Sequence, residues 1–222
     1  FMHSSFSSDI DHTRRQALRR LLELSALAGT TGLPLIGQAQ TNATMHARAI
    51  PSSGETLPVI GCGTWVGFGH APGSAEYQRL PAVLQALFAA GGRVIDSSPM
   101  YGRSEQTTGE LLATLPAATK PFLATKVWIR GRQAGIDQME QSFAYLRTKT
   151  IDLMQIHNLV DWKTQLATLR DWQSQRRIRF LGITHYTASA YAEVEAVLRT
   201  EKLDFLQINY SFDDRAAEQR LL

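Results

Sequence analysis

The stretch "VIDSSPMYGRSE" (residues 94–105) passes from two β-branched residues into a polar turn. Asp96 comes directly after the apolar pair, and Tyr101 follows within the turn. A carboxylate at the end of a buried strand is costly unless an opposite charge pairs with it. The stretch therefore predicts a strand that ends at Asp96 and a cationic partner close by. Arg103 and Glu105 are expected at the solvated start of the next helix, which Ser104 caps.

Outward from this stretch, short apolar runs alternate with longer amphipathic segments. The runs have strand length and β-branched or aromatic content, and they cover residues 57–63, 93–98, 121–127, 151–157, 178–184 and 203–209. The segments between them carry apolar residues at helical spacing and predict helices over 75–92, 104–115, 132–147, 161–175 and 187–200. This alternation predicts an α/β fold whose parallel strands are joined by right-handed crossovers.

The strand ends favour a closed barrel over an open sheet. A (β/α)8 barrel collects its catalytic groups at the C-terminal ends of its strands, and four polar side chains lie at or near such ends: Asp96, Lys126, His157 and Gln207. An open doubly wound sheet usually carries G-x-G-x-x-G after its first strand, and "GCGTWVGFG" (61–69) lacks that spacing. We therefore predict a (β/α)8 TIM barrel, with about six of its eight β/α units present.

Lys126 is the expected partner of Asp96, because it ends the next strand along the chain. An ammonium group held near the Tyr101 hydroxyl would lower the phenol pKa from its usual ~10, and such a tyrosine is a competent general acid. His157 is placed to orient a carbonyl beside it. Without the tyrosine, the Asp–Lys pair fits a structural ion pair equally well, and a lone histidine is more often a core residue.

These motifs together resemble the aldo-keto reductase family. The resemblance rests on "VIDSSPMYGRSE", "LATKV", "DLMQIH" and "RFLGITHY", in the family's order, and it covers residues 57–222. It implies a (β/α)8 barrel that binds NADPH across its mouth and reduces aldehyde or ketone carbonyls to alcohols. It also implies a catalytic tetrad of Asp96, Tyr101, Lys126 and His157, in which Tyr101 gives the proton and the cofactor gives the hydride.

The resemblance also implies which residues contact the ligands. The expected cofactor contacts are Gly63, Thr64, Thr184, His185 and Gln207, and the expected substrate contacts are Trp65 and Asn158. A packed core tryptophan is the other interpretation of Trp65. The pair Thr184-His185 stands where the family usually has Ser-Asn, and a neutral histidine donates one hydrogen bond or accepts one at a given nitrogen. Cofactor geometry is therefore expected to differ slightly from the family's.

Two further interpretations stay open beside the NADPH-dependent reductase. The chain could be a non-catalytic cofactor-binding or sensing barrel. It could also be an inactive fragment, because the family continues through two more strand-helix units that hold the adenosine 2'-phosphate. In that case residues 203–209 form an open edge that promotes association. The choice between NADPH and NADH is open for the same reason, and the complete protein is expected to be a monomer.

Composition narrows the classes of partner. The chain has 222 residues and a formal net charge of +3, without a basic run interleaved with aromatics on its body, which argues against nucleic acid. Its single cysteine excludes an intramolecular disulfide, and its six histidines show no metal-binding spacing. The expected partner is a small carbonyl compound, with no metal.

Residues 1–45 differ in character from residues 46–222, the predicted barrel domain. "TRRQALRR" precedes the mildly apolar "LLELSALAGTTGLPLIG" and the small-residue "QAQTNA", which is the order of an export signal and resembles the twin-arginine type. The apolar part is too short to span a bilayer stably. We expect export, for example to a periplasm; an amphipathic N-terminal helix on a cytoplasmic protein is the alternative.

The leader prediction is testable with a reporter. A fusion of residues 2–50 to a reporter is expected to leave the cytoplasm by the twin-arginine route, and Arg14→Lys together with Arg15→Lys is expected to stop it. Fractionation of cells measures the location. A reporter that stays cytoplasmic in the unmutated fusion contradicts the export interpretation.

Overall fold

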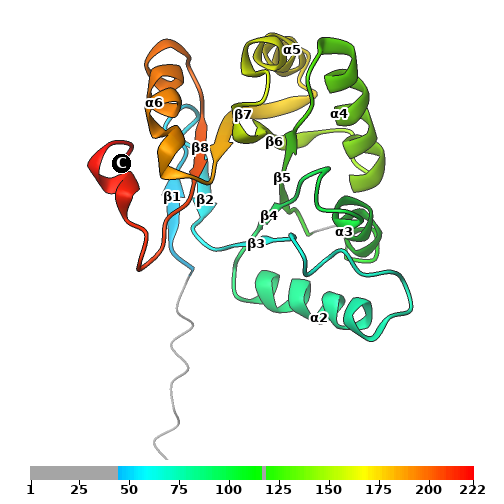
Figure 1. The fold of residues 1–222 in the computed structure, drawn as a ribbon. Helices are drawn as coiled ribbons and strands as arrows, with labels where there is room; N and C mark the ends of the chain where they lie inside the picture. Colours follow the sequence, from blue (N-terminus) through cyan, green and yellow to red (C-terminus); the bar gives the residue numbers. More distant parts are fainter. Residues whose placement is uncertain (1–44, 117–118) are drawn as a thin grey trace, which may run out of the picture. The chain divides into compact units, whose positions relative to one another are not determined.

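Six parallel strands form the main sheet, and each pairs with the next in chain order. The computed structural model describes residues 45–116 and 119–222. The strands are β3 (Gly61–Gly63), β4 (Val94–Asp96), β5 (Phe122–Val127), β6 (Ile151–Ile156), β7 (Ile178–His185) and β8 (Phe205–Ile208). The sheet curls into an arc (Figure 1). This arrangement confirms the predicted parallel α/β fold and is consistent with an incomplete (β/α)8 barrel.

Helices cover the outer face of this arc (Figure 1). They are α2 (Ala75–Ala89), α3 (Ser104–Leu112), α4 (Arg132–Leu146), α5 (Trp162–Ser174) and α6 (Tyr191–Thr200), with short 3-10 turns η2 (His157–Leu159), η3 (Ala188–Ala190) and η4 (Ala216–Gln219). One apolar core joins β5, β6 and β7 to α4, α5 and α6, and a second joins β4 and β5 to α2 and α3. Burial of one helix face against the sheet is the dominant stabilising term in such a layer.

The alternation of side chains along β5 sets the position of the site. Thr125 and Val127 face the helices, since Thr125 bonds to α3 and Val127 belongs to the core beneath α4 and α5. Phe122, Ala124 and Lys126 face the inside of the arc, where Phe122 packs against Phe180 at 5.9 Å between ring centroids. Successive side chains of a strand point to opposite faces. The inner face therefore changes from apolar at the strand starts to polar at the strand ends.

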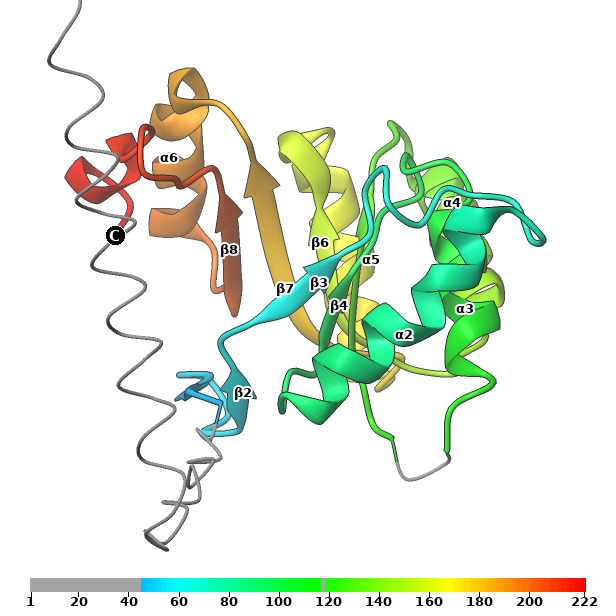
Figure 2. The ribbon, with the colours of Figure 1, turned by 90° about the horizontal axis from the view of Figure 1, so that it is seen from below.

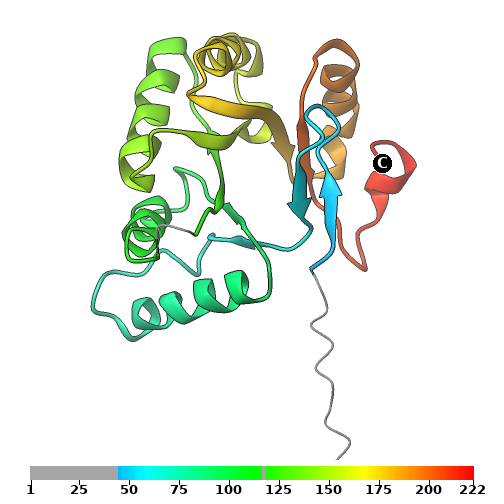
Figure 3. The same ribbon diagram turned by 180° about the vertical axis from the view of Figure 1, so that it is seen from behind.

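The expected strand over 57–63 is wrong in one respect, because two strands share that segment. Its first part belongs to β2 (Thr56–Pro58), which pairs antiparallel with β1 (Ala47–Ala49), and only β3 joins the main sheet. Figure 2 shows this hairpin away from the helices, and Figure 3 shows its two strands side by side. Ile50, at the hairpin turn, is buried among aromatic rings of the strand starts. The hairpin thus covers the apolar end of the inner face, and Glu55 also pairs with Arg179 of β7.

The start of α3 is buried, contrary to the expectation from the sequence. Glu105 is only 2% exposed. The Ser104 hydroxyl donates to carbonyl oxygens that precede it in the chain, those of Tyr101 at 2.8 Å and Thr64 at 3.0 Å. Ser104 is thus the first residue of the helix and does not cap it. The cause is close packing of α3 on α4, where a side chain at Gly109 would lie 2.1 Å from the Tyr145 carbonyl oxygen.

Replacing Gly109 tests this close packing. Gly109→Ala is expected to lower the free energy of unfolding by about 1–3 kcal/mol, because the added methyl group must push the two helices apart. Urea denaturation measures the loss. Gly67→Ala is the matched control, since the nearest atom to its added carbon lies 4.0 Å away. Equal stability of the two variants would show that the helices separate at little cost.

Candidate active site

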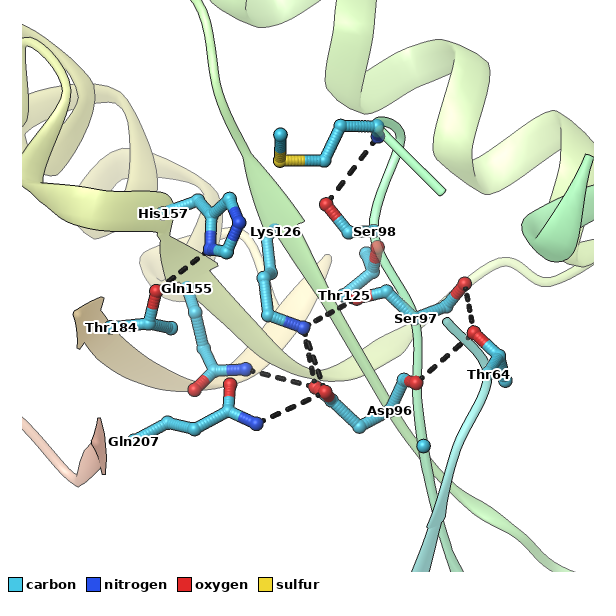
Figure 4. Close-up of polar contacts among 12 residues, drawn as sticks. Thr64, Asp96, Ser97, Ser98, Thr125, Lys126, Gln155, His157, Thr184 and Gln207 are labelled. Carbon is cyan, nitrogen blue, oxygen red and sulfur yellow. Dashed lines mark hydrogen bonds and ion pairs between the residues drawn. The ribbon is translucent and has the colours of Figure 1, made fainter. Parts of the chain in front are cut away.

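A buried ion pair between β4 and β5 forms the centre of the site (Figure 4). Lys126 Nζ donates to Asp96 Oδ1 at 2.9 Å, to Asp96 Oδ2 at 2.7 Å and to the Ser97 carbonyl oxygen at 2.7 Å. Lys126 is 1% exposed. An ammonium group has three protons to donate, so its donors are fully used. The structure thus brings together the predicted Asp–Lys partners.

Two glutamines also hold the Asp96 carboxylate. Gln155 Nε2 donates to Oδ1 at 3.2 Å, and Gln207 Nε2 donates to Oδ2 at 3.1 Å (Figure 4). Gln155 is a site residue that the sequence prediction missed. A polar residue within the apolar run 151–157 was the available signal. Gly182 makes room for it, because an added Cβ there would lie 3.1 Å from Gln155 Cγ.

Tyr101 lies beside the pair but is not tuned as expected. Lys126 Nζ lies 5.1 Å from the centre of its ring, and no hydrogen bond to the Tyr101 hydroxyl is found within residues 45–116 and 119–222. Burial, and then the charge of Asp96, raise the pKa of Tyr101 above its usual 10. The expected lowering of this pKa by Lys126 is therefore wrong for this arrangement. The physical reason is that Asp96 neutralises the ammonium and occupies its protons.

His157 also lies beside Tyr101, with the two rings edge to face at 6.4 Å between centroids. Its Nδ1 is 2.8 Å from the Thr184 hydroxyl oxygen (Figure 4). Burial, and then the positive charge of Lys126, lower the pKa of His157 from 6.5 to about 4. The imidazole is therefore neutral at physiological pH. When Thr184 donates to Nδ1, the ring proton lies on Nε2 and is available to a ligand.

Asn158 and His185 present complementary polar atoms near His157. The Asn158 backbone N–H donates to the Thr184 hydroxyl at 3.2 Å, whereas Asn158 Oδ1 is buried without a partner among the described residues. His185 Nδ1 accepts the backbone N–H groups of Tyr186 and Thr187, at 3.1 and 3.3 Å. The proton of a neutral His185 is therefore on Nε2. Asn158 Oδ1 is thus a buried acceptor without a partner among the described residues, and His185 Nε2 carries the proton when that ring is neutral.

The residues at the end of β3 and directly after it differ in how far they are buried. Thr64 is fully buried, and its hydroxyl donates to Ser97 Oγ at 2.9 Å and to the Asp96 carbonyl oxygen at 3.2 Å, so it braces the β4 turn. Gly63 has open space where a side chain would begin. Trp65 is 71% exposed, with its ring 6.5 Å from that of Tyr101. Trp65 is therefore not a packed core residue, and its exposed ring is free to contact a ligand.

Two other structural features are absent from the described ranges. No helix in residues 45–116 and 119–222 has the length and apolar character needed to cross a bilayer. The same part of the chain contains no group of three or more His, Cys, Asp or Glu side chains placed to hold a metal ion. The predicted export leader lies outside the described residues, apart from Met45 at its end.

The comparisons with known proteins agree on one family. The sequence matches the Aldo/keto reductase family over residues 59–222. It is 24% identical over 193 residues to aldo-keto reductase YhdN of Bacillus subtilis (strain 168), covering 80% of this chain and 57% of that protein. It is 28% identical over 199 residues to the NADH-specific methylglyoxal reductase of Escherichia coli (strain K12), covering 75% and 59% respectively. The chain thus spans little more than half the length of these curated relatives.

Solved structures show the same fold. The glycerol dehydrogenase AKR11B4 of Gluconobacter oxydans superposes with a TM-score of 0.65 at 26% identity, over 81% of this chain and 59% of that one.

The depressed pKa of His157 predicts how stability depends on pH. The unfolded chain binds this proton near pH 6.5 and the folded chain only near pH 4. The contribution of His157 to the free energy of unfolding is therefore complete above pH 6.5 and is lost as the pH falls towards 4. Urea denaturation of the unmodified chain and of His157→Gln at a series of pH values measures this contribution to the free energy of unfolding. Parallel curves for the two proteins, or an NMR midpoint for His157 near 6.5, would contradict the assignment.

Proposed function

Because the chain belongs to the aldo/keto reductase family, we propose that it is an oxidoreductase that reduces aldehyde or ketone carbonyls to alcohols, with NADPH as the hydride donor. The observation that supports this most is the arrangement at the strand ends. A buried Lys126–Asp96 pair lies next to Tyr101, and the ring of a neutral His157 lies edge to face with that of Tyr101. These are the groups needed to position and protonate a carbonyl oxygen.

Tyr101 is proposed as the general acid. Its raised pKa keeps the hydroxyl protonated across the neutral range, which a proton donor requires. The cofactor, when bound, supplies the hydride that turns the carbonyl oxygen into a strong base. An alkoxide is much more basic than a phenolate, so the transfer from Tyr101 is downhill. Lys126, whose charge is balanced by Asp96, lies 5.1 Å from the centre of the Tyr101 ring. His157 Nε2–H is proposed to orient the oxygen.

The chain's free polar atoms are proposed to hold the nicotinamide. His185 Nε2–H donates to the carboxamide oxygen, in place of the family's usual side chain, and Asn158 remains a proposed substrate contact. The amide oxygen of Gln207 is proposed to face the nicotinamide ring, because its Nε2 is bound to Asp96. One relative's name specifies NADH. Both NADPH and NADH must therefore be compared in the assay.

The substrate is proposed to be a small carbonyl compound that contacts Trp65. The exposed indole lies beside Tyr101, so a compound whose carbonyl reaches the Tyr101 hydroxyl also meets an apolar surface. Nucleic acid is not a proposed partner, and a monomeric complete protein is expected.

The role of Tyr101 is testable by one substitution. Tyr101→Phe is expected to lower kcat for an aromatic aldehyde by at least ~10²-fold, the contribution of a general acid, while the Kd for the reduced nucleotide is unchanged. Nucleotide absorbance follows turnover, and tryptophan fluorescence quenching follows binding. Tyr145→Phe is the control, since Tyr145 lies on α4 and bonds only to Gln141 there.

The outcomes separate the competing interpretations. A Tyr101→Phe variant with most of the original rate would remove Tyr101 from the proposed role. Binding of NADPH or NADH without turnover in the unmodified chain would instead favour a cofactor-binding barrel. Binding of neither nucleotide would contradict both.

A further inference from the structure

Glu105 is a buried carboxylate that the proposed reaction does not use. It begins the first turn of α3 and is 2% exposed, although acidic residues in a first turn usually face water. A buried carboxylate is costly unless hydrogen bonds or opposite charges compensate it. Its partners therefore indicate why this position holds a glutamate.

The partner of Glu105 is the residue next to Lys126. Thr125 donates its hydroxyl proton to Glu105 Oε1 at 2.6 Å, whereas the nearby Ser142 hydroxyl of α4 donates to the Gln138 carbonyl oxygen at 3.3 Å. Thr125 and Lys126 are consecutive in β5 and point to opposite faces. Glu105 therefore binds the outer face of the strand directly behind the residue whose ammonium group pairs with Asp96 on the inner face.

Glu105 also follows directly on the segment that carries Tyr101. Ser104, its neighbour, donates to the Tyr101 carbonyl oxygen at 2.8 Å. The Thr125–Glu105 bond and the Ser104–Tyr101 bond thus join β5 to the Tyr101 turn through two consecutive residues. Displacement of α3 from β5 would move Tyr101 relative to Lys126.

We propose that Glu105 is a positioning residue of this site: it fixes Thr125 and the Tyr101 turn from the outer face of β5, and its charge helps keep Lys126 protonated. Four ionisable groups face or lie near Lys126, from four different segments. They are Asp96 of β4, Glu105 of α3, Tyr101 of the intervening turn and His157 of η2. The two carboxyl groups lie on opposite sides of β5, and the ammonium group is bonded on the side of Asp96.

The electrostatic directions agree with this arrangement. Burial lowers the pKa of Lys126, whereas Asp96, and to a smaller extent Glu105, raise it. Burial raises the pKa of Glu105, and the Thr125 hydrogen bond, the nearby Ser142 hydroxyl and the Lys126 charge oppose that rise. The coupling is mutual, so each group is expected to titrate differently when the other is removed.

Two isosteric substitutions separate charge from hydrogen bonding. Glu105→Gln keeps an oxygen for Thr125 but removes the charge, and Thr125→Val removes the hydroxyl but keeps the charge. In the full chain, Glu105→Gln is expected to lower the Lys126 titration midpoint by about 0.5–1 pH unit, the scale of two partly screened charges on either side of a strand. Thr125→Val is expected to leave that midpoint unchanged while lowering the melting temperature. NMR of 13C-labelled lysine measures the midpoint, and Lys126→Met assigns the signal.

A reciprocal measurement covers the case in which Glu105→Gln does not fold. Lys126→Met is expected to raise the titration midpoint of the Glu105 carboxyl, observed by NMR of 13C-labelled glutamate in the chain that keeps Glu105. An unchanged Lys126 midpoint in a folded Glu105→Gln variant, or an unchanged Glu105 midpoint in Lys126→Met, would overturn the inference and leave Glu105 a structural residue only.

The inference rests on the proposed function only for its kinetic consequence. If the chain reduces carbonyls, the alkaline limb of kcat against pH is expected to move to lower pH in Glu105→Gln, and not in Thr125→Val. The NMR midpoints need no turnover. An inactive chain with coupled midpoints would therefore contradict the proposed function and support the role of Glu105.

Discussion

The buried Lys126–Asp96 pair is the constraint on which the rest of the site depends. An ammonium group that is 1% exposed is stable only when all of its protons are bonded, and here they are. The acceptors come from β4 and from the residue directly after it. The carboxylate in turn receives amide groups from β6 and β8. The C-terminal ends of four strands, β4, β5, β6 and β8, must therefore lie level with one another for these bonds to form.

This arrangement also determines which neighbours carry charge. The same shielding from water raises the pKa of Tyr101 and lowers that of His157, so both are neutral when the pair is ionised. The site thus contains one internally balanced ion pair and two neutral groups that can hydrogen-bond to a ligand. A neutral carbonyl is a better match to such a site than an anion is.

The sequence predicted the architecture well because the apolar runs and the helical segments are long and periodic. The parallel sheet and the convergence of Asp96, Lys126 and His157 followed from where those runs end. The hairpin was missed because the three residues of β1 are all exposed and carry no apolar pattern. Tertiary packing that no local pattern encodes accounts for the other differences.

Two residues illustrate that limit. Glu105 looked solvated because helix starts usually are, but α4 and β5 cover the start of α3. Gln155 looked like part of an apolar strand, and only the glycine on the next strand shows that its side chain has room inside the arc.

The sequential order of the strands has a consequence for how the chain acquires its shape. Each strand from β4 to β8 lies beside the one made immediately before it. Every crossover therefore closes a loop of modest length, and a growing chain can add one strand and one helix at a time to an existing edge. The Arg179–Glu55 pair is different, since it joins the hairpin to β7 across 124 positions. During synthesis the hairpin must wait for β7 before that contact can form, and Phe122 of β5 must wait for the Phe180 and Phe205 rings that pack against it, so the apolar end of the arc is completed late.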